Sequence, residues 1–496
     1  ARGLTVRTPV AILSGNSVSH ALVALGAMHA GIPVAPISPA YSLVSRDHAK
    51  LQAIVGALGP GLVFADDSVR FGRALDAIGA TPTPLEALRA RRPGTRVDEA
   101  FASITPDTIA KVLHTSGSTD SPKGVTNTHR MLCSSQQGWA QLWPFLDETP
   151  PILCDWLPWH HTVGGNGAFN LVLRNGGTLY VDEGRPTEAL IGVTARNLRE
   201  IAPTLYFNVP RGFDLLLPLL EADPDLRRAF YSRLEALYYT AAALPQNLWD
   251  RLTALPNNEG RQVPILSGWG STETTLSTRV HYPIDRPGNV GNPGPGVEIK
   301  LVPSGNRHEA RVRGPNVTPG YYRRPDLTRE AFDEEGFYRT GDAIALADPD
   351  DPARGLIFEG RVAEDFKLSS GTWVHVGAVR VALIAACQPL LQDAVITGHD
   401  RDEVGALVFL DQAAVHTLGL DPAAVRRRLQ QALARIASAS TGSSTAPARL
   451  LILDEPPSLD DEEITDKGYL NQRAVLTRRA ARVDELHAGG PQAIVV

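Results

Sequence analysis

The sequence predicts an α/β protein with three parts: a large N-terminal domain of mainly parallel sheets with helices, a β-subdomain within it, and a small mobile α+β C-terminal domain. Three observations support this class. Short apolar runs alternate with segments of helical period through the first two thirds of the 496 residues. Turns rich in Gly and Pro, with short strands between them, follow from about Pro287. Beyond Arg361 strand and helix patterns are mixed.

In the first part of the chain, each apolar run predicts a strand because it is short and rich in β-branched or aromatic residues. The expected strands are 10–13, 32–38, 61–67, 111–117, 152–158, 177–184, 204–210 and 236–244. Apolar residues at helical spacing between them predict helices such as 17–31 and 186–204. This alternation is typical of parallel sheets, in which ligands bind at loops beyond the carboxyl ends of the strands.

The last part of the chain continues with short strands and one clear helix. The β-subdomain is expected to contain strands at 296–302, 309–314 and 355–360. A helix is expected over 421–438, where Asp421 and Pro422 precede an apolar stripe. Arg426 to Arg428 are expected on its solvated face. We place a boundary near residue 362, which gives an N-terminal domain over 1–362 and a C-terminal domain over 363–496.

Composition excludes several classes of function. The net charge of −6, the pI near 6.1 and the scattered 48 basic residues argue against nucleic acid as a partner and against membrane insertion. The three cysteines, Cys133, Cys154 and Cys387, have no paired or metal-ligand spacing. They therefore argue against a disulfide framework or structural zinc, and they favour a reducing, cytoplasmic location.

The segment HTSGSTDSPKGV, residues 114–125, is the first candidate site. It is too rich in Gly, Ser and Thr to form a core strand or helix, and its hydroxyls, backbone N–H groups and Lys123 suit a chain of phosphates. A simple linker is the alternative. Strand-like residues on both sides favour a phosphate loop on a rigid sheet. It is not an ordinary nucleotide-kinase loop, because Pro122 precedes Lys123 and Gly124 follows it.

Four further segments carry groups that suit a nucleotide. SGWGSTET, 267–274, offers a flat apolar ring in Trp269, a hydroxyl in Thr272 and a hard oxygen ligand for Mg²⁺ in Glu273. YRTGD ends in Asp342, a carboxylate able to accept two hydroxyls of a ribose. GRVAEDFKLSSGTWV and EITDKGYLNQR follow, at 360–374 and 463–473. Each segment alone also fits a solvated charge or a turn.

Together and in this order, the five segments resemble the adenylate-forming enzymes: acyl- and aryl-CoA synthetases, luciferases and the adenylation domains of peptide synthetases. The phosphate loop of that family reads T-S-G-[ST]-T-G-x-P-K-G, and residues 115–124 match it except at Asp120. KLSSGTWV and ITDKGYLNQRAV are similar to the feruloyl-CoA synthetase branch. The resemblance covers essentially the whole chain. Because the chain begins at Ala1, close to the first strand, we expect the N-terminal domain to be truncated at its start.

The resemblance implies ATP with Mg²⁺, and coenzyme A as co-substrate. It gives the ATP phosphates the following donors: Thr115, Ser116, Gly117, Ser118, Thr119 and Lys123. It assigns Glu273 to Mg²⁺, and Trp269, Gly270 and Thr272 to the nucleotide. The carboxylate of Asp120 repels a triphosphate, so we expect a weaker nucleotide KM rather than loss of activity.

The C-terminal half of the site follows from the same resemblance. Asp342 is expected on the ribose hydroxyls, and Arg361 on the ribose or phosphates. Lys467 is expected on the substrate carboxylate and the α-phosphate, although an exposed lysine in an acidic loop is the alternative. A hinge among Ala363, Glu364 and Asp365 would exchange Lys467 for KLSSG, where Gly371 lets pantetheine approach the backbone.

The acid is expected to bind near two further segments. LPWHHTVGG aligns His161 with the family histidine beside the acyl pocket and the thiol tunnel, whereas His160 is expected to be packed or exposed. YYTAAAL is expected along the adenine and the acyl pocket, where Ala241, Ala242 and Gly268 leave room for a flat ring. Tight sheet packing explains such small residues equally well.

The function predicted is a two-step ligase. ATP and an aromatic acid, such as the hydroxycinnamate ferulate, give an acyl-adenylate, which coenzyme A converts to a thioester. One alternative is a fatty acyl-CoA synthetase or the adenylation part of a carrier-dependent enzyme, and the few residues after Asn471 disfavour a fused carrier. The other is a non-catalytic nucleotide-binding homologue. Asp120 and the expected truncation at the start favour it, whereas Lys123, Glu273, Asp342 and Lys467 argue against it.

Overall fold

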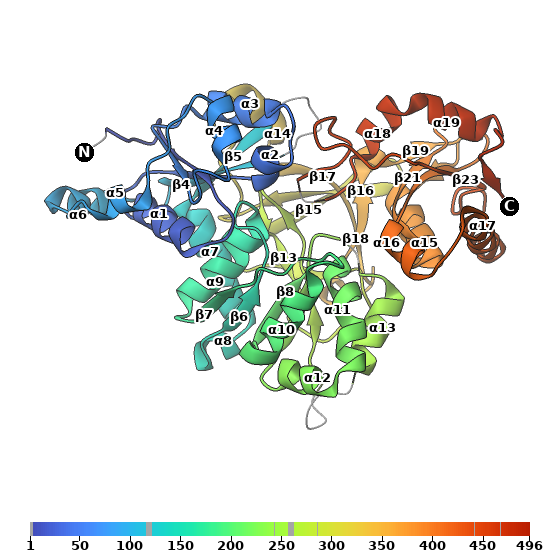
Figure 1. Ribbon diagram of the computed structural model, residues 1–496, viewed down its shortest axis with the longest axis horizontal. Helices are drawn as coiled ribbons and strands as arrows, with labels where there is room; N and C mark the ends of the chain where they lie inside the picture. Colours follow the sequence, from blue (N-terminus) through green and yellow to red (C-terminus); the bar gives the residue numbers. More distant parts are fainter. Residues whose placement is uncertain are drawn as a thin grey trace. The chain divides into compact units, whose positions relative to one another are not determined.

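The computed structural model describes residues 3–115, 122–242, 244–255, 262–284, 286–440, 442–466 and 468–496. The chain divides into two compact units (Figure 1). The first consists of Ala1–Val302, Ala310–Thr340 and Leu346–Ile357, and the second of Pro303–Glu309, Gly341–Ala345 and Phe358–Val496. The boundary near residue 362 stays a prediction, because the second unit also takes in two short upstream segments.

The first sheet has five strands in the order β3-β1-β2-β4-β5. Their bounds are β1 Val10–Leu13, β2 Val34–Ile37, β3 Leu62–Ala65, β4 Ile109–Thr115 and β5 Lys123–Thr128. The first four run parallel, and β5 returns antiparallel to β4. The strands β1 to β3 are buried on both faces, which explains why they consist of continuous apolar runs.

Helices flank this sheet, drawn in blue in Figure 1. They are α1 Val18–His29, α2 Pro39–Leu43, α3 Ala49–Leu58, α4 Gly72–Ala77, α5 Leu85–Arg89 and α6 Thr95–Ala102. The helix α1 begins where predicted, because the Ser17 side chain accepts a hydrogen bond from the His20 N–H. The helix α3 ends at Leu58 and is capped by Gly59, whose φ of 57° lies in the left-handed region that glycine adopts at little cost.

The middle of the chain adds two more parallel groups of strands. The groups are β10-β9-β8 and β6-β7. Their bounds are β6 Ile152–Asp155, β7 Thr178–Val181, β8 Leu205–Asn208, β9 Ala236–Tyr239 and β10 Ile265–Leu266. Helices here are α7 His129–Leu142, α8 Phe145–Glu148, α9 Phe169–Arg174, α10 Ile191–Ile201, α11 Pro210–Ala222, α12 Pro224–Tyr231 and α13 Gln246–Ala254. Aromatic and leucine side chains of α10 to α13 pack against β8 and β9 to form the core of this region.

The part rich in Gly and Pro forms short strands, as predicted. They are β11 Gly270–Ser271, β12 Thr275–Leu276, β13 Thr278–Arg279, β14 Asn289–Pro293, β15 Glu298–Ser304, β16 Arg307–Arg313, β17 Tyr338–Leu346 and β18 Leu356–Arg361. The strands β13 to β18 form one sheet in the order β13-β14-β18-β17-β16-β15. A helix, α14 Pro325–Ala331, and a 3₁₀ turn, Pro352–Arg354, lie between these strands in the chain.

The second unit is an α+β body around a four-stranded sheet in the order β21-β22-β23-β24. The 3₁₀ turn Val362–Glu364 is followed by β19 Phe366–Lys367, β20 Trp373–Val374, β21 Leu391–Thr397, β22 Gly405–Leu410, β23 Arg449–Ile452 and β24 Ile494–Val495. Its helices are α15 Val376–Cys387, α16 Gln412–Thr417, α17 Pro422–Ala439, α18 Gln472–Arg478 and α19 Ala480–His487. Side chains of β21 alternate: Ile396 packs in the cluster of α15 and α17, and Val395 in that of α18 and α19. The architecture confirms the predicted α/β class.

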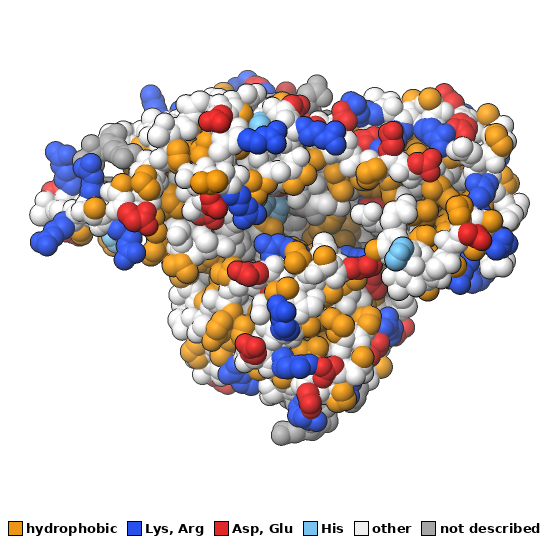
Figure 2. Space-filling view, viewed as in Figure 1, with side chains coloured by type: hydrophobic (Ala, Val, Ile, Leu, Met, Phe, Trp, Pro, Cys, Tyr) orange, Lys and Arg blue, Asp and Glu red, His pale blue; other side chains and the backbone are white. Residues whose placement is uncertain are grey.

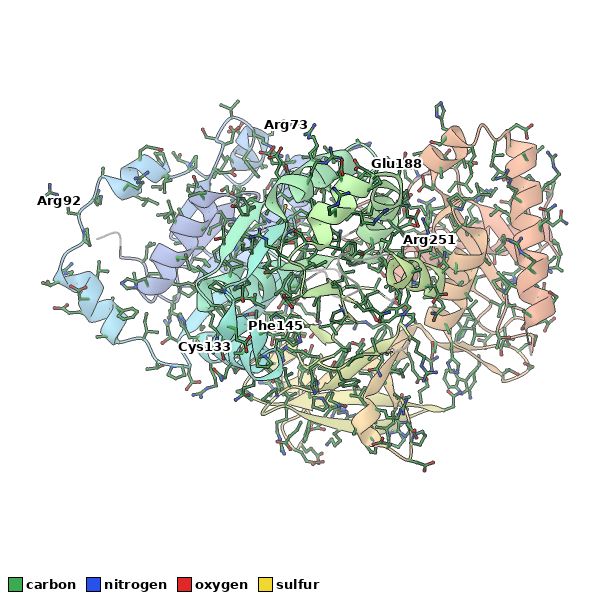
Figure 3. The ribbon with its side chains drawn as sticks, turned by 90° about the horizontal axis from the view of Figure 1, so that it is seen from below. Arg73, Arg92, Cys133, Phe145, Glu188 and Arg251 are labelled. Atoms are coloured by element: carbon green, nitrogen blue, oxygen red, sulfur yellow. The ribbon has the colours of Figure 1, made fainter. Side chains whose placement is uncertain are left out.

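The surface charges, the helix lengths and the cysteines add three facts. Acidic and basic side chains are interspersed on the face shown in Figure 2. Among the described helices, none combines the length and the apolar character needed to cross a bilayer. All three cysteines are free thiols: Cys154 and Cys387 are buried, and Cys133 on α7 is exposed (Figure 3).

Candidate active site

The predicted phosphate loop joins two paired strands. Thr115 at the end of β4 and Lys123 at the start of β5 are cross-strand partners. Because β4 runs parallel to β2, its carboxyl end lies at the edge of the sheet where ligands bind in such folds. Of the residues between them, six lie outside the described residues: Ser116, Gly117, Ser118, Thr119, Asp120 and Ser121.

A segment from later in the chain pairs with β5 and brings an aromatic ring to Lys123. The Tyr322 N–H donates to the Gly124 carbonyl at 2.7 Å, and the Thr126 N–H donates to the Gly320 carbonyl at 3.1 Å. Tyr321 lies between them as the bridge partner of Val125. The Lys123 ammonium nitrogen is 5.5 Å from the centre of the Tyr321 ring, a cation–π distance.

The hydroxyl of the same tyrosine reaches Glu273. The Tyr321 hydroxyl donates to Glu273 Oε1 at 3.1 Å and lies 3.1 Å from the Tyr338 hydroxyl. The backbone is tied as well, since the Thr318 N–H donates to the Glu273 carbonyl at 2.7 Å. Lys123 and Glu273, predicted from separate motifs, therefore interact with the ring and the hydroxyl of one side chain.

Burial determines the protonation of the two tyrosines. It raises the pKa of Tyr321 well above the usual range, and the adjacent Glu273 carboxylate raises it further. The pKa of Tyr338 is raised for the same two reasons. Both hydroxyls therefore keep their protons near neutral pH, so they act as hydrogen-bond donors that orient the Glu273 carboxylate.

The motif around Trp269 is a tight hairpin. Gly270 pairs with Leu276 across β11 and β12, and a Cβ at Gly270 would lie 1.7 Å from the Thr275 carbonyl oxygen, so only glycine fits. Trp269 and Thr272 are each 6% exposed, so little of the Trp269 ring, which was assigned to the nucleotide, is open. These positions come together with Glu273 because they belong to one hairpin.

The alanines predicted to line the pocket lie at the carboxyl end of β9. Ala241 and Ala242 are exposed, and Ala241 has φ of 77°, which side chains rarely adopt. Gly268 follows the neighbouring parallel strand β10. A Cβ there would lie 2.5 Å from the Thr278 carbonyl oxygen and 2.6 Å from the Tyr238 hydroxyl. Packing therefore explains glycine at this position, but it does not explain the exposed alanines.

His161 precedes a π-helix, an unusual element that often occurs at functional sites. This helix, η1, spans Thr162–Ala168. Gly164 and Gly165 approach the preceding backbone so closely that a Cβ would lie 2.4 Å from the Pro158 carbonyl oxygen or 2.2 Å from that of Trp159. The His160 and His161 rings lie 4.1 Å apart, and both side chains are half-buried.

In the second unit, the structure pairs two predicted residues. Arg361 Nε lies 2.9 Å from Asp342 Oδ1, and the Asp342 side chain is buried whereas that of Arg361 is exposed. Gly371 lies in a turn with φ of 82°, with open space where a side chain would be. Its N–H donates to the Leu368 carbonyl at 2.8 Å.

The hinge candidates differ in how firmly they are held. Asp365 accepts hydrogen bonds from the His375 ring at 2.9 Å and from the Val376 N–H at 3.0 Å, and it pairs with Arg307 at 3.1 Å. These contacts anchor Asp365 within the second unit, whereas Ala363 and Glu364 belong to the 3₁₀ turn that precedes it. Burial raises the pKa of Glu364, and the Arg380 and Arg361 charges oppose that rise. Lys467 lies outside the described residues.

Two residues of this site were missed from the sequence. Tyr321 follows Gly320 and belongs to no predicted motif. Its partners, Lys123 and Glu273, are distant in the sequence. Lys111, buried in β4, hydrogen-bonds to η1. A single lysine within the apolar run IAKVLHT was the available signal for it.

Comparison with known proteins identifies the family. A model described as AMP-binding enzyme matches residues 1–322, and one described as AMP-binding enzyme C-terminal domain matches residues 368–490. A carboxylic acid reductase of Segniliparus rugosus is 26% identical over 416 residues, 77% of this chain but only 33% of that protein. A 7a-methyl-1,5-dioxo-octahydroindenyl propanoyl:CoA ligase of Rhodococcus jostii is 25% identical over 80% of this chain and 78% of its own length.

Solved structures have the same fold. ATP-bound MatB from Rhodopseudomonas palustris superimposes with a TM-score of 0.71 at 26% identity, covering 97% of this chain and 90% of that one. A malonyl-CoA ligase in a ternary product complex with methylmalonyl-CoA and AMP gives 0.60 at 29% identity, covering 90% of each chain. Since the two family models together match most of the sequence, this chain belongs to the AMP-binding enzyme family, within the adenylate-forming superfamily that its motifs predicted.

Proposed function

We propose that this chain is an AMP-forming acid–thiol ligase, which activates a carboxylic acid with ATP and transfers the acyl group to coenzyme A. The observation that carries the proposal is the convergence of Lys123 and Glu273 on Tyr321. The relatives support it, since they include a CoA ligase from Rhodococcus jostii and a protein from Humulus lupulus named as a probable CoA ligase. The finer proposal is an aromatic acid, such as ferulate, and it rests on the resemblance of KLSSGTWV and ITDKGYLNQRAV to one branch.

The chemistry requires two anions to meet. A carboxylate oxygen attacks the α-phosphorus, the bond to the β-phosphate oxygen breaks, and pyrophosphate leaves. The coenzyme A thiol sulfur then attacks the acyl carbon, and AMP leaves as the thiol proton is released to a base or solvent. Because both reactants of the first step are negative, catalysis consists mainly of charge neutralisation and positioning.

The residues of the first unit fit the phosphates and Mg²⁺. Lys123 supplies an ammonium at one end of the phosphate loop, with Thr115 at the other end and Ser116, Gly117, Ser118 and Thr119 between them. The Glu273 carboxylate has lone pairs beyond the one that Tyr321 occupies, and it is the hard oxygen ligand that Mg²⁺ prefers. When bound there, Mg²⁺ supplies positive charge to the phosphates. Thr272, Trp269, Gly270, Ala241 and Ala242 are assigned to the nucleotide.

The remaining roles belong to the acid, the ribose and the thiol. His161 is proposed beside the acid and the thiol, Asp342 and Arg361 at the ribose, and Lys467 at the substrate carboxylate and α-phosphate. Gly371 is proposed to admit pantetheine after 363–496 turns relative to 1–362, about a hinge among Ala363, Glu364 and Asp365. The open space at Gly371 supports this role.

A second candidate function is adenylation followed by transfer to a carrier thiol. Carboxylic acid reductases support it: those of Segniliparus rugosus and Mycobacterium tuberculosis are 26% and 27% identical over about three quarters of this chain. Both proposals share the first step and differ only in the thiol. A fatty acid in place of the aromatic acid is the other variant of the proposal.

Pyrophosphate release over ferulate, coumarate, benzoate and fatty acids, with and without coenzyme A, tests these proposals. We expect release with an aromatic acid and thioester formation with coenzyme A. Release without any thioester would favour the carrier-dependent alternative. Release with a long-chain acid alone would refute the aromatic substrate. No release with any acid would support a non-catalytic homologue.

A further inference from the structure

One asparagine bridges the two strands below the predicted phosphate loop. Lys111 on β4 and Asn127 on β5 are cross-strand partners, and both are buried. The Lys111 ammonium donates to Asn166 Oδ1 at 3.1 Å and to the Gly165 carbonyl at 3.0 Å. Asn166 Nδ2 donates to Asn127 Oδ1 at 2.7 Å. The single Asn166 side chain therefore binds both strands of the hairpin.

The same face of this hairpin leads to the ends of the loop. Thr115 and Lys123 form another cross-strand pair, four residues after Lys111 on β4 and four residues before Asn127 on β5. Alternate residues of a strand share a face, so this pair and the pair of Lys111 and Asn127 lie on one face, roughly 13 Å apart. Asn166 therefore contacts the hairpin on the face that also carries Thr115 and Lys123, the paired residues that flank the loop.

Asn166 belongs to η1, the π-helix that follows His161. The Gly165 N–H donates to the His161 carbonyl at 2.8 Å, so two consecutive hydrogen bonds connect the Lys111 ammonium to the backbone of His161. From α7, Gln136 Nε2 donates to the Asn166 carbonyl at 2.7 Å. The hairpin and α7 thus hold the π-helix from two sides.

Lys111 is an unfavourable choice for a residue that only fills space. It is 4% exposed, and its acceptors within the described part of the chain are a backbone carbonyl and an amide oxygen, both neutral. Burial lowers its pKa to about 8. Methionine would fill nearly the same volume without burying an ammonium. A lysine at this buried position therefore indicates that its two hydrogen bonds have a role beyond filling the volume.

We propose that Lys111 is a positioning residue, which through Gly165 and Asn166 fixes His161 relative to the hairpin that carries the phosphate loop. The inference rests on the proposed function, in which His161 lies beside the acid and Lys123 binds the ATP phosphates. It deepens that function, because the distance between the acid and the α-phosphate is then set by one buried network rather than by the loop alone.

Lys111→Met tests the role, since it keeps the volume and removes both hydrogen bonds. We expect kcat/KM for the acid to fall by about tenfold or more in pyrophosphate release, while KM for ATP stays within about twofold. Thr204→Val is the matched control. It removes a hydrogen bond of another buried side chain, from the Ile152 N–H to Thr204 Oγ1 at 2.8 Å, in the sheet region of β6 and β8. This variant is expected to leave both constants unchanged.

A double-mutant cycle with His161→Ala separates positioning from mere stability. If Lys111 acts through His161, adding Lys111→Met to His161→Ala lowers kcat/KM for the acid by less than about twofold. If the loss of kcat/KM for the acid in the double variant equals the product of the two single losses, the proposal is overturned. Unimpaired activity in His161→Ala would also overturn it. Failure of the proposed function is distinguishable, because then the wild-type chain itself releases no pyrophosphate, and both inferences are refuted together.

Discussion

Tyr321→Phe removes one hydroxyl and leaves the ring that faces Lys123 in place. The lost hydroxyl makes hydrogen bonds of 3.1 Å to Glu273 and to Tyr338. A hydrogen bond to a charged acceptor contributes about 1.5–3 kcal/mol. Because Glu273 is partly exposed and water replaces part of the contact, we take the lower part of that range, about 1.5–2 kcal/mol. This corresponds to a loss of roughly 10- to 30-fold in kcat/KM for ATP.

The assay is pyrophosphate release at saturating acid, with ATP and Mg²⁺ varied in turn. We expect the loss to appear in kcat/KM for ATP, together with a higher Mg²⁺ requirement, because the variant's Glu273 carboxylate is less well oriented. Tyr322→Phe is the matched control. This neighbouring tyrosine is on the same segment, and its hydroxyl donates to the Val6 carbonyl at 3.0 Å, away from Glu273. A Tyr321→Phe variant within twofold of wild type would refute the reasoning.

Three further predictions concern stability. Ala241→Gly should raise the free energy of unfolding by about 1 kcal/mol, because φ of 77° costs an L-residue roughly 1–2 kcal/mol; a lower urea midpoint would contradict this. Burial raises the pKa of Asp155 to about 7 from 3.8, so between these pH values the folded state holds a proton that the unfolded state has released. Stability therefore falls as pH rises through this window. Asp155→Asn should flatten that decline, and parallel pH profiles for the two proteins would disprove the assignment. Arg307→Met should destabilise the second unit by about 3 kcal/mol, because it breaks a buried pair with Asp365; an unchanged melting transition would argue against it.

Local patterns predicted the elements whose boundaries depend on neighbouring residues. The helix expected over 421–438 is α17, and Asp421 caps it by accepting a hydrogen bond of 2.6 Å from the Ala424 N–H. The helix expected over 186–204 is α10 and is shorter. It begins at Ile191 after a turn, and it ends at Ile201 because Ala202 has φ of 47° and precedes a proline.

Two further differences have separate causes, one in the local backbone and one in a contact with a distant segment. The strand expected over 236–244 ends at Tyr239, because the positive φ of Ala241 interrupts extended structure. Arg426 was expected in solvent, but its guanidinium donates to the carbonyls of Gln492 and Ala493. No local pattern shows that the end of the chain returns to this helix.

The candidate site likewise contains residues that local motifs predict and residues whose role depends on contacts with distant segments. Lys123 and Glu273 were predicted from motifs, because each lies in a short segment with a typical composition. Tyr321, which joins them, was missed, since its role depends on the pairing of Gly320–Tyr322 with β5. Lys111 was visible as a lysine in an apolar strand, but its partner Asn166 lies in a π-helix that the sequence pattern does not predict.

Calorimetric titration of ATP in the presence of Mg²⁺ tests the central claim most directly, namely that Lys123 and Glu273 act on one ligand. The proteins to compare are wild type, Lys123→Met, Glu273→Gln and the double variant. We predict that wild type binds ATP, that each single variant binds at least tenfold more weakly, and that the double variant loses less than the product of the two effects. Unchanged ATP affinity in both single variants would contradict the account.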